Sequence, residues 1–142
     1  MSQITRKAQV VIATPDPYLL LLQTNQERGS YWQNCTGKIE DDEDFIAGAT
    51  REAMEETGLA EDNIIDAQDI DLQHDFTDRW HRQVVERAIL ILVKEKWDII
   101  IDPSEHQNFK WLAIDDLSFE SVKYPGNFEA LKKASLMLKE KA

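Results

Sequence analysis

Three glutamates stand at a spacing that brings them together on one side of a helix. Glu52, Glu55 and Glu56 are related as i, i+3 and i+4, and side chains at such positions have Cβ atoms about 5–6 Å apart. Arg51 can pair with Glu55, but one guanidinium group cannot neutralise all of these carboxylates. Each like-charge pair costs about 0.2–0.5 kcal/mol on a solvated helix, and the repulsion grows where water is excluded. The cluster is therefore either a solvated acidic face or a scaffold for cations.

A hard divalent cation would relieve this repulsion. Mg²⁺ takes oxygen ligands at about 2.0–2.1 Å and usually combines one or two carboxylates with waters and substrate phosphates. The glutamates of this helix offer oxygen ligands at a suitable spacing. The helix is therefore a candidate site for one or more Mg²⁺ ions and a bound pyrophosphate.

A wider pattern surrounds the cluster. From Gly37 to Leu59 the chain follows G-x5-E-x7-R-E-A-x-E-E-x-G-L. This pattern matches the signature box of the Nudix hydrolases at every defined position. Ala53 stands where that family has an aliphatic residue that is often larger. The chain thus resembles the Nudix hydrolase family.

Nudix hydrolases cleave nucleoside diphosphates linked to another group, with Mg²⁺ or Mn²⁺, by attack of water on a phosphorus of the pyrophosphate bridge. The resemblance implies that Glu52, Glu55 and Glu56 are the metal ligands. It adds the backbone carbonyl of Gly37 as a further ligand. Glu52 would instead, or also, orient or deprotonate the attacking water.

The resemblance assigns supporting roles to the remaining residues of the box. Arg51 would hold the catalytic carboxylates in place. Glu43 would support the loop or a metal-bound water. Gly58 would end the helix at a backbone position where a side chain would obstruct it. These residues are expected to shape the site around the metal ligands.

Segments outside the box resemble one subgroup, the bacterial dihydroneopterin triphosphate diphosphatases that are often labelled dATP pyrophosphohydrolases. The matching segments are YWQNCTGKIE, SEHQNFKWLAIDD and YPGNFEAL, so the likeness covers most of the chain. It implies that Trp32, which precedes Gln33, and Asn127 contact the substrate. Glu105 would be an additional metal ligand or base, or else a plain loop carboxylate. His106 could be catalytic, or could only cap or pack.

Two basic segments are further candidates for substrate binding. Many relatives have Gln-Arg after the second strand, where this chain has Gln23 and Thr24, so Arg28 in the following loop is the candidate replacement. The other segment consists of Arg79, Trp80, His81 and Arg82. A Trp can stack on a ring, and an Arg can pair with phosphate. The alternative for this second segment is a hairpin turn with a surface basic pair.

Hydrophobic patterns predict the strands that position these residues. Extended segments are predicted at 8–14, 18–23, 63–76, 81–95, 97–101 and 108–113. The first two are separated by Pro-Asp-Pro and are expected to form a hairpin. The continuously apolar run Ala88–Val93 is typical of a strand that is covered on both faces.

Two helices are predicted to flank these strands. The first covers 44–57, begins among acidic residues and is stopped by Gly58. The second covers 127–141, with Asn127 as its N-cap. This order of elements predicts an α/β fold in which a mixed β-sheet is sandwiched between helices, an α/β/α sandwich. The length fits a single domain over residues 1–142.

Composition limits the partners. Asp and Glu number 27 against 16 Lys and Arg, a formal net charge of −11, which disfavours nonspecific binding to nucleic acid or anionic membranes. A small phosphorylated substrate held through a cation remains compatible with this charge.

Cys35 is the only cysteine, and it is interpreted as a packing residue in a cytoplasmic protein. The apolar stretch before Pro15 is too short for a signal peptide or membrane span, and a monomer or homodimer is expected from the resemblance.

The leading hypothesis is a Mg²⁺-dependent diphosphatase, with Mn²⁺ as a substitute. It would convert a nucleoside or pterin triphosphate, such as dihydroneopterin triphosphate or dATP, to the monophosphate and pyrophosphate. Hydrolysis of dinucleoside polyphosphates or nucleotide sugars would use the same box. A nucleotide-sensing Nudix domain without turnover is the alternative from another class. Such domains often have degraded boxes, whereas this chain retains Arg51 and the three glutamates.

Overall fold

The fold is built on a mixed β-sheet of seven strands. The computed structural model describes residues 4–140. Its strands are β1 Ile4–Ala13, β2 Tyr18–Thr24, β3 Trp32–Gln33, β4 Cys35–Lys38, β5 Ile64–Thr77, β6 Gln83–Val93 and β7 His106–Ala113. They follow the order β3-β2-β1-β6-β5, with β4 on β1 and β7 on β2. Of the predicted strands, those at 8–14, 18–23, 63–76, 81–95 and 108–113 correspond to β1, β2, β5, β6 and β7.

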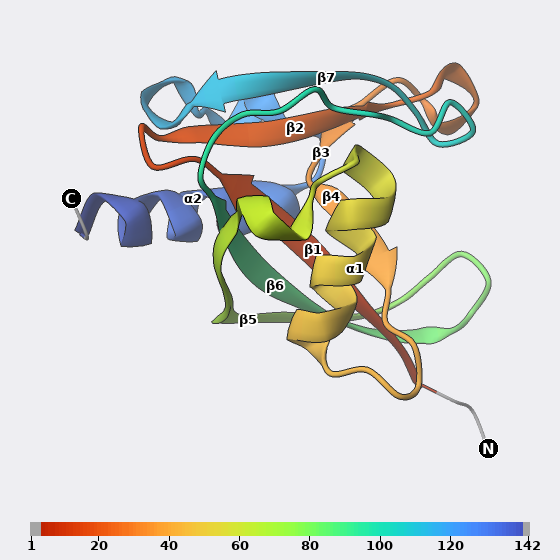
Figure 1. Cartoon of the computed structure of the whole chain (residues 1–142). Coiled ribbons are helices and arrows are strands. Elements are labelled where there is room, and N and C mark those ends of the chain that lie inside the picture. Colours follow the sequence, from red (N-terminus) through yellow and green to blue (C-terminus); the bar gives the residue numbers. More distant parts are fainter. Residues whose placement is uncertain (1–3, 141–142) are drawn as a thin grey trace.

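The first strand is the centre of the sheet, and its pairing corrects the predicted hairpin. β1 runs parallel to β6 from Ile4 to Ala13 and antiparallel to β4. It meets β2 only at Ala13, opposite Leu19. The expected hairpin therefore exists only at its closed end, because β4 takes the place beside β1 that β2 would occupy. The two strands diverge like a fork, and Figure 1 shows β2 and β7 in a layer apart from β1 and β6.

Two α-helices cover opposite faces of the sheet, as the sequence predicts. Helix α1 spans Phe45–Thr57 and α2 spans Pro125–Glu140. The side chain of Asp44 accepts a hydrogen bond from the backbone N–H of Ala47 at the start of α1, and Gly58 ends the helix in the left-handed conformation. Neither helix has the length and apolar character that would let it cross a membrane. Figure 1 shows α1 on the near side of β1 and α2 on the other side.

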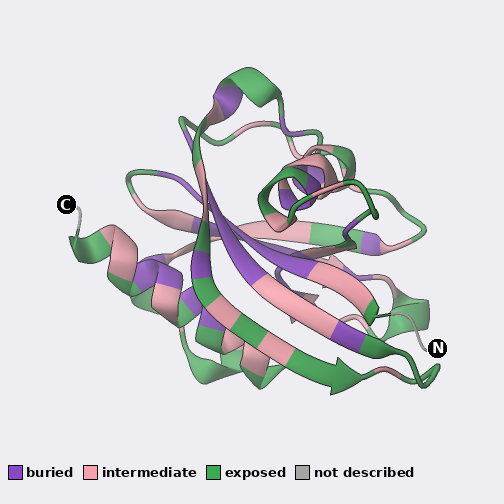
Figure 2. Cartoon of the chain, turned by 90° about the horizontal axis from the view of Figure 1, so that it is seen from below, coloured by how far each residue is buried: buried purple, intermediate pink, exposed green. Residues whose placement is uncertain are grey.

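Alternating side chains of β1 supply both halves of the core. Val10 and Ile12 pack in the half that contains α1, and Val11 and Ala13 pack in the half that contains α2. The run Ala88–Val93 in β6 is buried apart from the half-buried Leu92, as expected for a strand covered on both faces. Figure 2 shows this burial along the middle of the sheet and the inner sides of the helices.

The predicted strand at 97–101 is wrong. This segment belongs to the connection between β6 and β7 and forms no strand. Its apolar residues Trp97, Ile99 and Ile101 pack on the core half beneath α1, and the indole N–H of Trp97 donates to the carbonyl of Thr57 at 2.9 Å. One-sided packing on a helix produces the same alternation of apolar residues as a half-buried strand.

The predicted N-cap of the last helix is also wrong. Helix α2 begins at Pro125, a residue whose fixed φ suits the first helical position. Asn127 therefore lies inside the first turn, and it is 6% exposed. Its side chain donates to Gln9 of β1 at 3.0 Å. The residue links the helix to the sheet instead of capping the helix.

The left-handed end of α1 predicts a stability effect. Gly58 has φ 72°, and a Cβ at this residue would lie 3.1 Å from Cδ1 of Ile100. Gly58→Ala is expected to lower the free energy of unfolding by about 1–2 kcal/mol, because a Cβ disfavours this conformation. Urea unfolding of the variant beside the natural protein measures the change. An unchanged unfolding midpoint would contradict it.

Gly126→Ala is the matched control for this change. Gly126 lies in α2 without a positive φ, and a Cβ there would meet the His74 ring at an ordinary contact distance of 3.4 Å. Alanine is favoured over glycine inside a helix by about 0.5–1 kcal/mol. The control is therefore expected to keep or raise the unfolding midpoint.

Candidate active site

The end of β4 brings the glutamate cluster against the sheet. Gly37 in β4 is paired with Ala8 of β1, and a Cβ at Gly37 would collide with the carboxyl group of Glu52. Glycine at this position therefore lets the carboxyl group lie against the main chain of β4. The loop that follows is closed by Glu43, whose Oε1 accepts from the backbone N–H of Glu40 at 2.8 Å.

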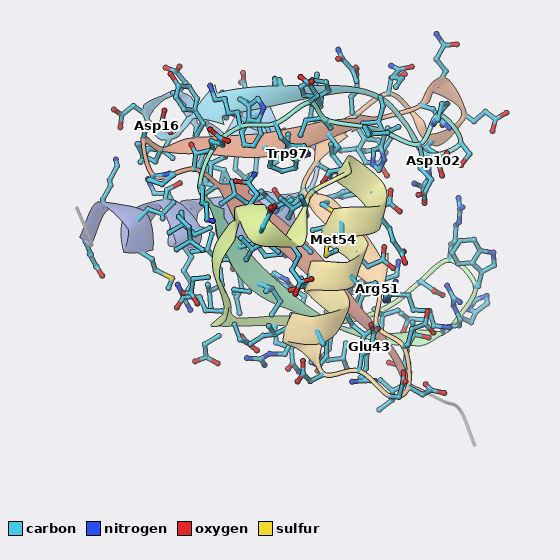
Figure 3. All side chains as sticks on the ribbon, viewed as in Figure 1. Asp16, Glu43, Arg51, Met54, Trp97 and Asp102 are labelled. Carbon is cyan, nitrogen blue, oxygen red and sulfur yellow. The ribbon has the colours of Figure 1, made fainter. Side chains whose placement is uncertain are left out.

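Arg51 organises one side of the cluster. Its Nε and Nη2 donate to the two oxygens of Glu43 at 2.7 and 2.9 Å, and these bonds hold the pKa of Glu43 at about 2. Its Nη1 donates to Glu52 at 3.0 Å and to Glu55 at 3.1 Å. Nη2 also donates to the carbonyl of Lys38 at 2.9 Å. Figure 3 shows Arg51 and Glu43 together beside the N-terminal half of α1, so one guanidinium group ties the loop to the helix.

The other side of the cluster has no such counter-charge. Burial raises the pKa of Glu56 to about 8, and a hydrogen bond and the negative charge of Glu105 act in the same direction. The charge of Asp102, labelled in Figure 3 near the C-terminal half of α1, adds to this effect. Oε2 of Glu56 is 3.8 Å from Nδ1 of His106, and both atoms are buried without a hydrogen-bond partner among the described residues.

Two further side chains enclose the glutamates. His106 is 3% exposed, its burial lowers its pKa, and its Nε2 is 3.2 Å from Nε2 of Gln33. Cys35 is 1% exposed in the core, as expected for a packing residue. Burial and then the charges of the neighbouring glutamates raise the pKa of the Cys35 thiol.

The donor set fits a divalent cation. Residues 4–140 contain no three His, Cys, Asp or Glu side chains that already converge as ligands, but Mg²⁺ needs only one or two carboxylates beside water and phosphate oxygens. Burial raises the pKa values of Glu52 and Glu56, because their charged forms lack sufficient counter-charge. Mg²⁺ or Mn²⁺ bound to these oxygens would supply it. Glu55 lies at the margin, with 59% of its side chain exposed.

The predicted substrate residues outside the box lie in different places. Arg28 ends the short helix η1 Gln26–Arg28, and its Nη1 is 3.8 Å from Oε1 of Glu105. Trp32 is half-buried beside the core half that contains α2, and Asn127 is buried in the first turn of α2. Of these residues, Arg28 lies beside a carboxylate of the candidate site, that of Glu105.

The basic segment at 79–82 forms the turn between β5 and β6. Nε of Arg82 pairs with Asp78 at 2.7 Å, and the guanidinium groups of Arg79 and Arg82 lie 4.3 and 5.0 Å from the ring of Trp80. His81 has φ 62° at the tip. Among the described residues, no hydrogen bond or ion pair joins this segment to the box glutamates. Its contacts are those of a hairpin turn.

Sequence analysis missed a group of polar residues on the sheet face that carries α2. Gln9 and Asn34 are fully buried, and Glu86 and His74 lie beside them across β6 and β5. One sequence signal could have indicated the group, because Gln9 interrupts the apolar half of β1, from Ala8 to Ala13. The partners of Gln9 come from distant segments and give no such signal.

Comparison with known proteins identifies relatives of the whole domain. A family model described as the NUDIX domain matches residues 4–133. A dihydroneopterin triphosphate diphosphatase of Haemophilus influenzae is 31% identical over 132 residues, which cover 87% of this chain and 83% of that protein. An octanoyltransferase of Myxococcus xanthus is 31% identical over 124 residues, or 85% of this chain. The chain spans only 33% of the length of that second protein.

Solved structures share the fold. The binary complex of C. elegans Ap4A hydrolase has a TM-score of 0.76 at 21% identity, covering 96% of this chain and 98% of that chain. The E. coli dihydroneopterin triphosphate pyrophosphohydrolase has a TM-score of 0.77 at 22% identity, covering 93% and 95%. The sheet, the two helices and their order therefore match structures of known hydrolases.

The raised pKa of Glu56 predicts a pH dependence of stability for the metal-free protein. The pKa of this carboxyl group is about 8 in the folded protein against an ordinary value of 4.5. Its contribution to stability is fully present below the unfolded-state pKa and is lost as the pH rises through the folded-state pKa. Glu56→Gln removes this titration. The free energy of unfolding of the natural protein, relative to that of the variant, should therefore fall as the pH rises from about 5 to about 8.

Urea unfolding in the presence of a chelator measures this difference. Glu55→Gln, an exposed change on the same helix, is the matched control and should follow the natural protein at each pH. Excess Mg²⁺ should restore stability at the higher pH, because it binds the charged carboxylates of the native state. A difference between Glu56→Gln and the natural protein that stays constant over this range would contradict the account.

Proposed function

Because the chain belongs to the Nudix family, whose members hydrolyse phosphoric anhydride bonds, we propose that it hydrolyses a nucleoside or pterin triphosphate to the monophosphate and pyrophosphate. The observation that carries this proposal is Oε2 of Glu56, which is buried without a hydrogen-bond partner among the described residues and belongs to a carboxyl group whose pKa lies near 8 beside Glu105. Such a pair favours a bound divalent cation, and a cation there favours a polyphosphate ligand.

The proposed metal ligands are Glu52, Glu56 and the carbonyl of Gly37, with Glu105 as a further ligand. When bound, Mg²⁺ or Mn²⁺ would neutralise charge on the pyrophosphate and lower the pKa of a water. Glu55, whose side chain is exposed at the margin of the site, is proposed to bind the cation from the outer edge of the site. These residues together would hold the scissile phosphates against the C-terminal end of β4 and the face of α1.

Proton transfer is assigned to a carboxylate of the same cluster. Burial raises the pKa of Glu52 above its usual range, which makes its carboxylate a better base. Arg51 holds the Oε1 of Glu52 at 3.0 Å, and so fixes the direction of the other oxygen. Glu52 would orient the attacking water or take its proton, with Glu105 as the alternative base.

Positive charge for the substrate comes from Arg28. Its guanidinium group is 3.8 Å from Glu105 and about half of its side chain is exposed, at 46%. A phosphate that reaches the cluster can therefore meet Arg28 as a charge-assisted partner. The triphosphate class is supported by the likeness to the Haemophilus influenzae diphosphatase over 87% of the chain.

Product analysis tests the proposal. The protein and its Glu52→Gln variant would be incubated with Mg²⁺ and a panel of dihydroneopterin triphosphate, NTPs, dNTPs, diadenosine polyphosphates, ADP-ribose and nucleotide sugars. The expected result is a monophosphate plus pyrophosphate from a triphosphate. The variant should lose a factor of about 10²–10⁴ in kcat/KM, the usual contribution of a positioned acid or base. Glu61→Gln, an exposed change just after the end of the box, serves as the control.

The other outcomes separate the alternatives. Cleavage of only dinucleotides or nucleotide sugars would retain the metal chemistry and replace the substrate class. Tight nucleotide binding without cleavage of any compound would indicate the sensor. Equal rates for the natural protein and Glu52→Gln would contradict the role assigned to this carboxylate.

A further inference from the structure

A second set of polar side chains lies on the opposite face of the sheet from the glutamate cluster. We call Gln9, Asn34 and Asn127 the amide cluster. Their exposed fractions are 0%, 0% and 6%. Gln9 stands between Ala8 and Val10, which both pack in the core half beneath α1, so its side chain points toward the start of α2. Three buried amides in a small domain need a complete set of hydrogen bonds.

The orientation of each amide is fixed by its neighbours. Nε2 of Gln9 is 3.3 Å from Oε1 of Glu86 and 3.3 Å from the carbonyl oxygen of Gly126. Both neighbours are acceptors, so the nitrogen of Gln9 must face them. Its Oε1 then accepts from Nδ2 of Asn34 at 2.9 Å and from Nδ2 of Asn127 at 3.0 Å. The side-chain oxygens of both asparagines are consequently turned away from Gln9.

This arrangement leaves acceptors without donors. Oδ1 of Asn34 and Oδ1 of Asn127 are buried and have no hydrogen-bond partner among the described residues. Glu86 accepts through Oε1 only, among residues 4–140, and 15% of its side chain is exposed. An unmet buried polar group costs about 1–3 kcal/mol. Of these acceptors, the carboxyl group of Glu86 is partly exposed, and it is the one that a ligand with N–H donors can reach.

The groups that face Glu86 do not satisfy it. Nδ1 of His74 is 3.9 Å from Oε1 of Glu86, too far for a hydrogen bond, while Nε2 of the same ring lies 3.0 Å from Glu129. Lys7 acts on Glu86 through its charge alone. Burial raises the pKa of Glu86, which is consistent with a carboxyl group that lacks a close partner.

Asn34 connects this surface to the glutamate cluster. Its neighbour Gln33 meets His106 at 3.2 Å, and its other neighbour, Cys35, packs in the core half that contains α1, where the charges of Glu56 and Glu52 raise the pKa of its thiol. Successive side chains of an extended segment point to opposite sides, so one short segment serves both faces. A ring held beside Asn34 would thus lie close to the proposed phosphate site.

Aromatic side chains border the same region. The rings of Tyr31 and Tyr124 meet edge to face with centroids 5.3 Å apart, and Nζ of Lys123 is 4.6 Å from the centroid of Tyr31. Tyr124 directly precedes α2, where its carbonyl accepts from the backbone N–H of Asn127 at 3.0 Å. This aromatic pair offers apolar surface for a flat ring next to the hydrogen-bonding groups.

We propose that Glu86, oriented by Gln9, recognises the ring of the substrate and selects rings with a 2-amino-4-oxopyrimidine edge. This edge, present in guanine and in pterins, carries a ring N–H beside an amino group, and a carboxylate can accept from both. Adenine presents a ring nitrogen acceptor at the corresponding place, which would face the carboxylate without a proton between them. The inference rests on the proposed function and narrows its substrate class.

Glu86→Gln tests this recognition directly. The side-chain carbonyl of the new glutamine can keep the hydrogen bond from Gln9, so its amide nitrogen faces the ring. This nitrogen is a donor, and it cannot accept from the ring N–H and amino group as the carboxylate would. The variant should lose about 10- to 100-fold in kcat/KM for GTP and dihydroneopterin triphosphate, the usual effect of one hydrogen bond to a charged group. Its kcat/KM for ATP should hold or rise, because the new N–H can pair with the ring nitrogen of adenine.

Glu129→Gln is the matched control. Glu129 lies beside the same histidine but its side chain is 52% exposed, and the change should leave the guanine-to-adenine ratio unaltered. Melting temperatures of both variants show whether they are folded. A ratio that is the same in Glu86→Gln and in the natural protein would overturn the inference, while hydrolysis of triphosphates by both would leave the proposed function standing.

Binding to the metal-free protein separates the two proposals. Calorimetry with guanosine, 7,8-dihydroneopterin and adenosine requires no hydrolysis and no phosphate. Tighter binding of the first two, lost in Glu86→Gln, would support the ring recognition even if no triphosphate were cleaved. Equal affinity for all of them, or no binding of any up to millimolar concentration, would overturn it.

Discussion

Negative charge that the chain cannot balance by itself is the constraint on which the active site depends. Arg51 binds Glu43, Glu52 and Glu55 through hydrogen bonds of 2.7 to 3.1 Å. On the other side, the described cation nearest to Glu105 is Arg28 at 3.8 Å, and Glu56 has a pKa near 8. A divalent cation bound there would stabilise the charged form of these carboxylates. Its charge would also explain how a protein with a net charge of −11 can receive a polyanionic substrate.

The sheet provides the geometry that makes this possible. β1 and β2 meet only where Ala13 opposes Leu19, and the short strands β3 and β4 occupy the separate arms of the resulting fork. At their junction, the successive side chains of Gln33, Asn34 and Cys35 point alternately to the two faces of the sheet. One face then carries the carboxylates beside α1, and the other carries the amide cluster beside α2. Catalysis and ring recognition would therefore share a single backbone segment.

Local signals made the box helix predictable. Asp44 begins it and Gly58 ends it, and both act on backbone groups within a few residues of themselves. The segment 97–101 was misassigned because its apolar residues pack on a helix and find no strand partner, a fact that lies outside the segment. The amide cluster escaped prediction for the same reason, since Gln9 acquires its partners only when β1, β4, β6 and α2 come together. The box residues were identifiable from their spacing. Only the three-dimensional structure shows which of their carboxylates are paired with Arg51 and which lack a counter-charge.

Anomalous X-ray scattering from crystals grown with Mn²⁺ tests the central claim most directly, because it locates the cation without reference to turnover. The account predicts an anomalous peak within bonding distance of carboxylate oxygens of Glu52 and Glu56 and of the carbonyl oxygen of Gly37. Glu56→Gln crystals should show a weaker peak or none. Manganese bound only elsewhere, at a concentration that supports hydrolysis in solution, would contradict the assignment of this cluster as the metal site.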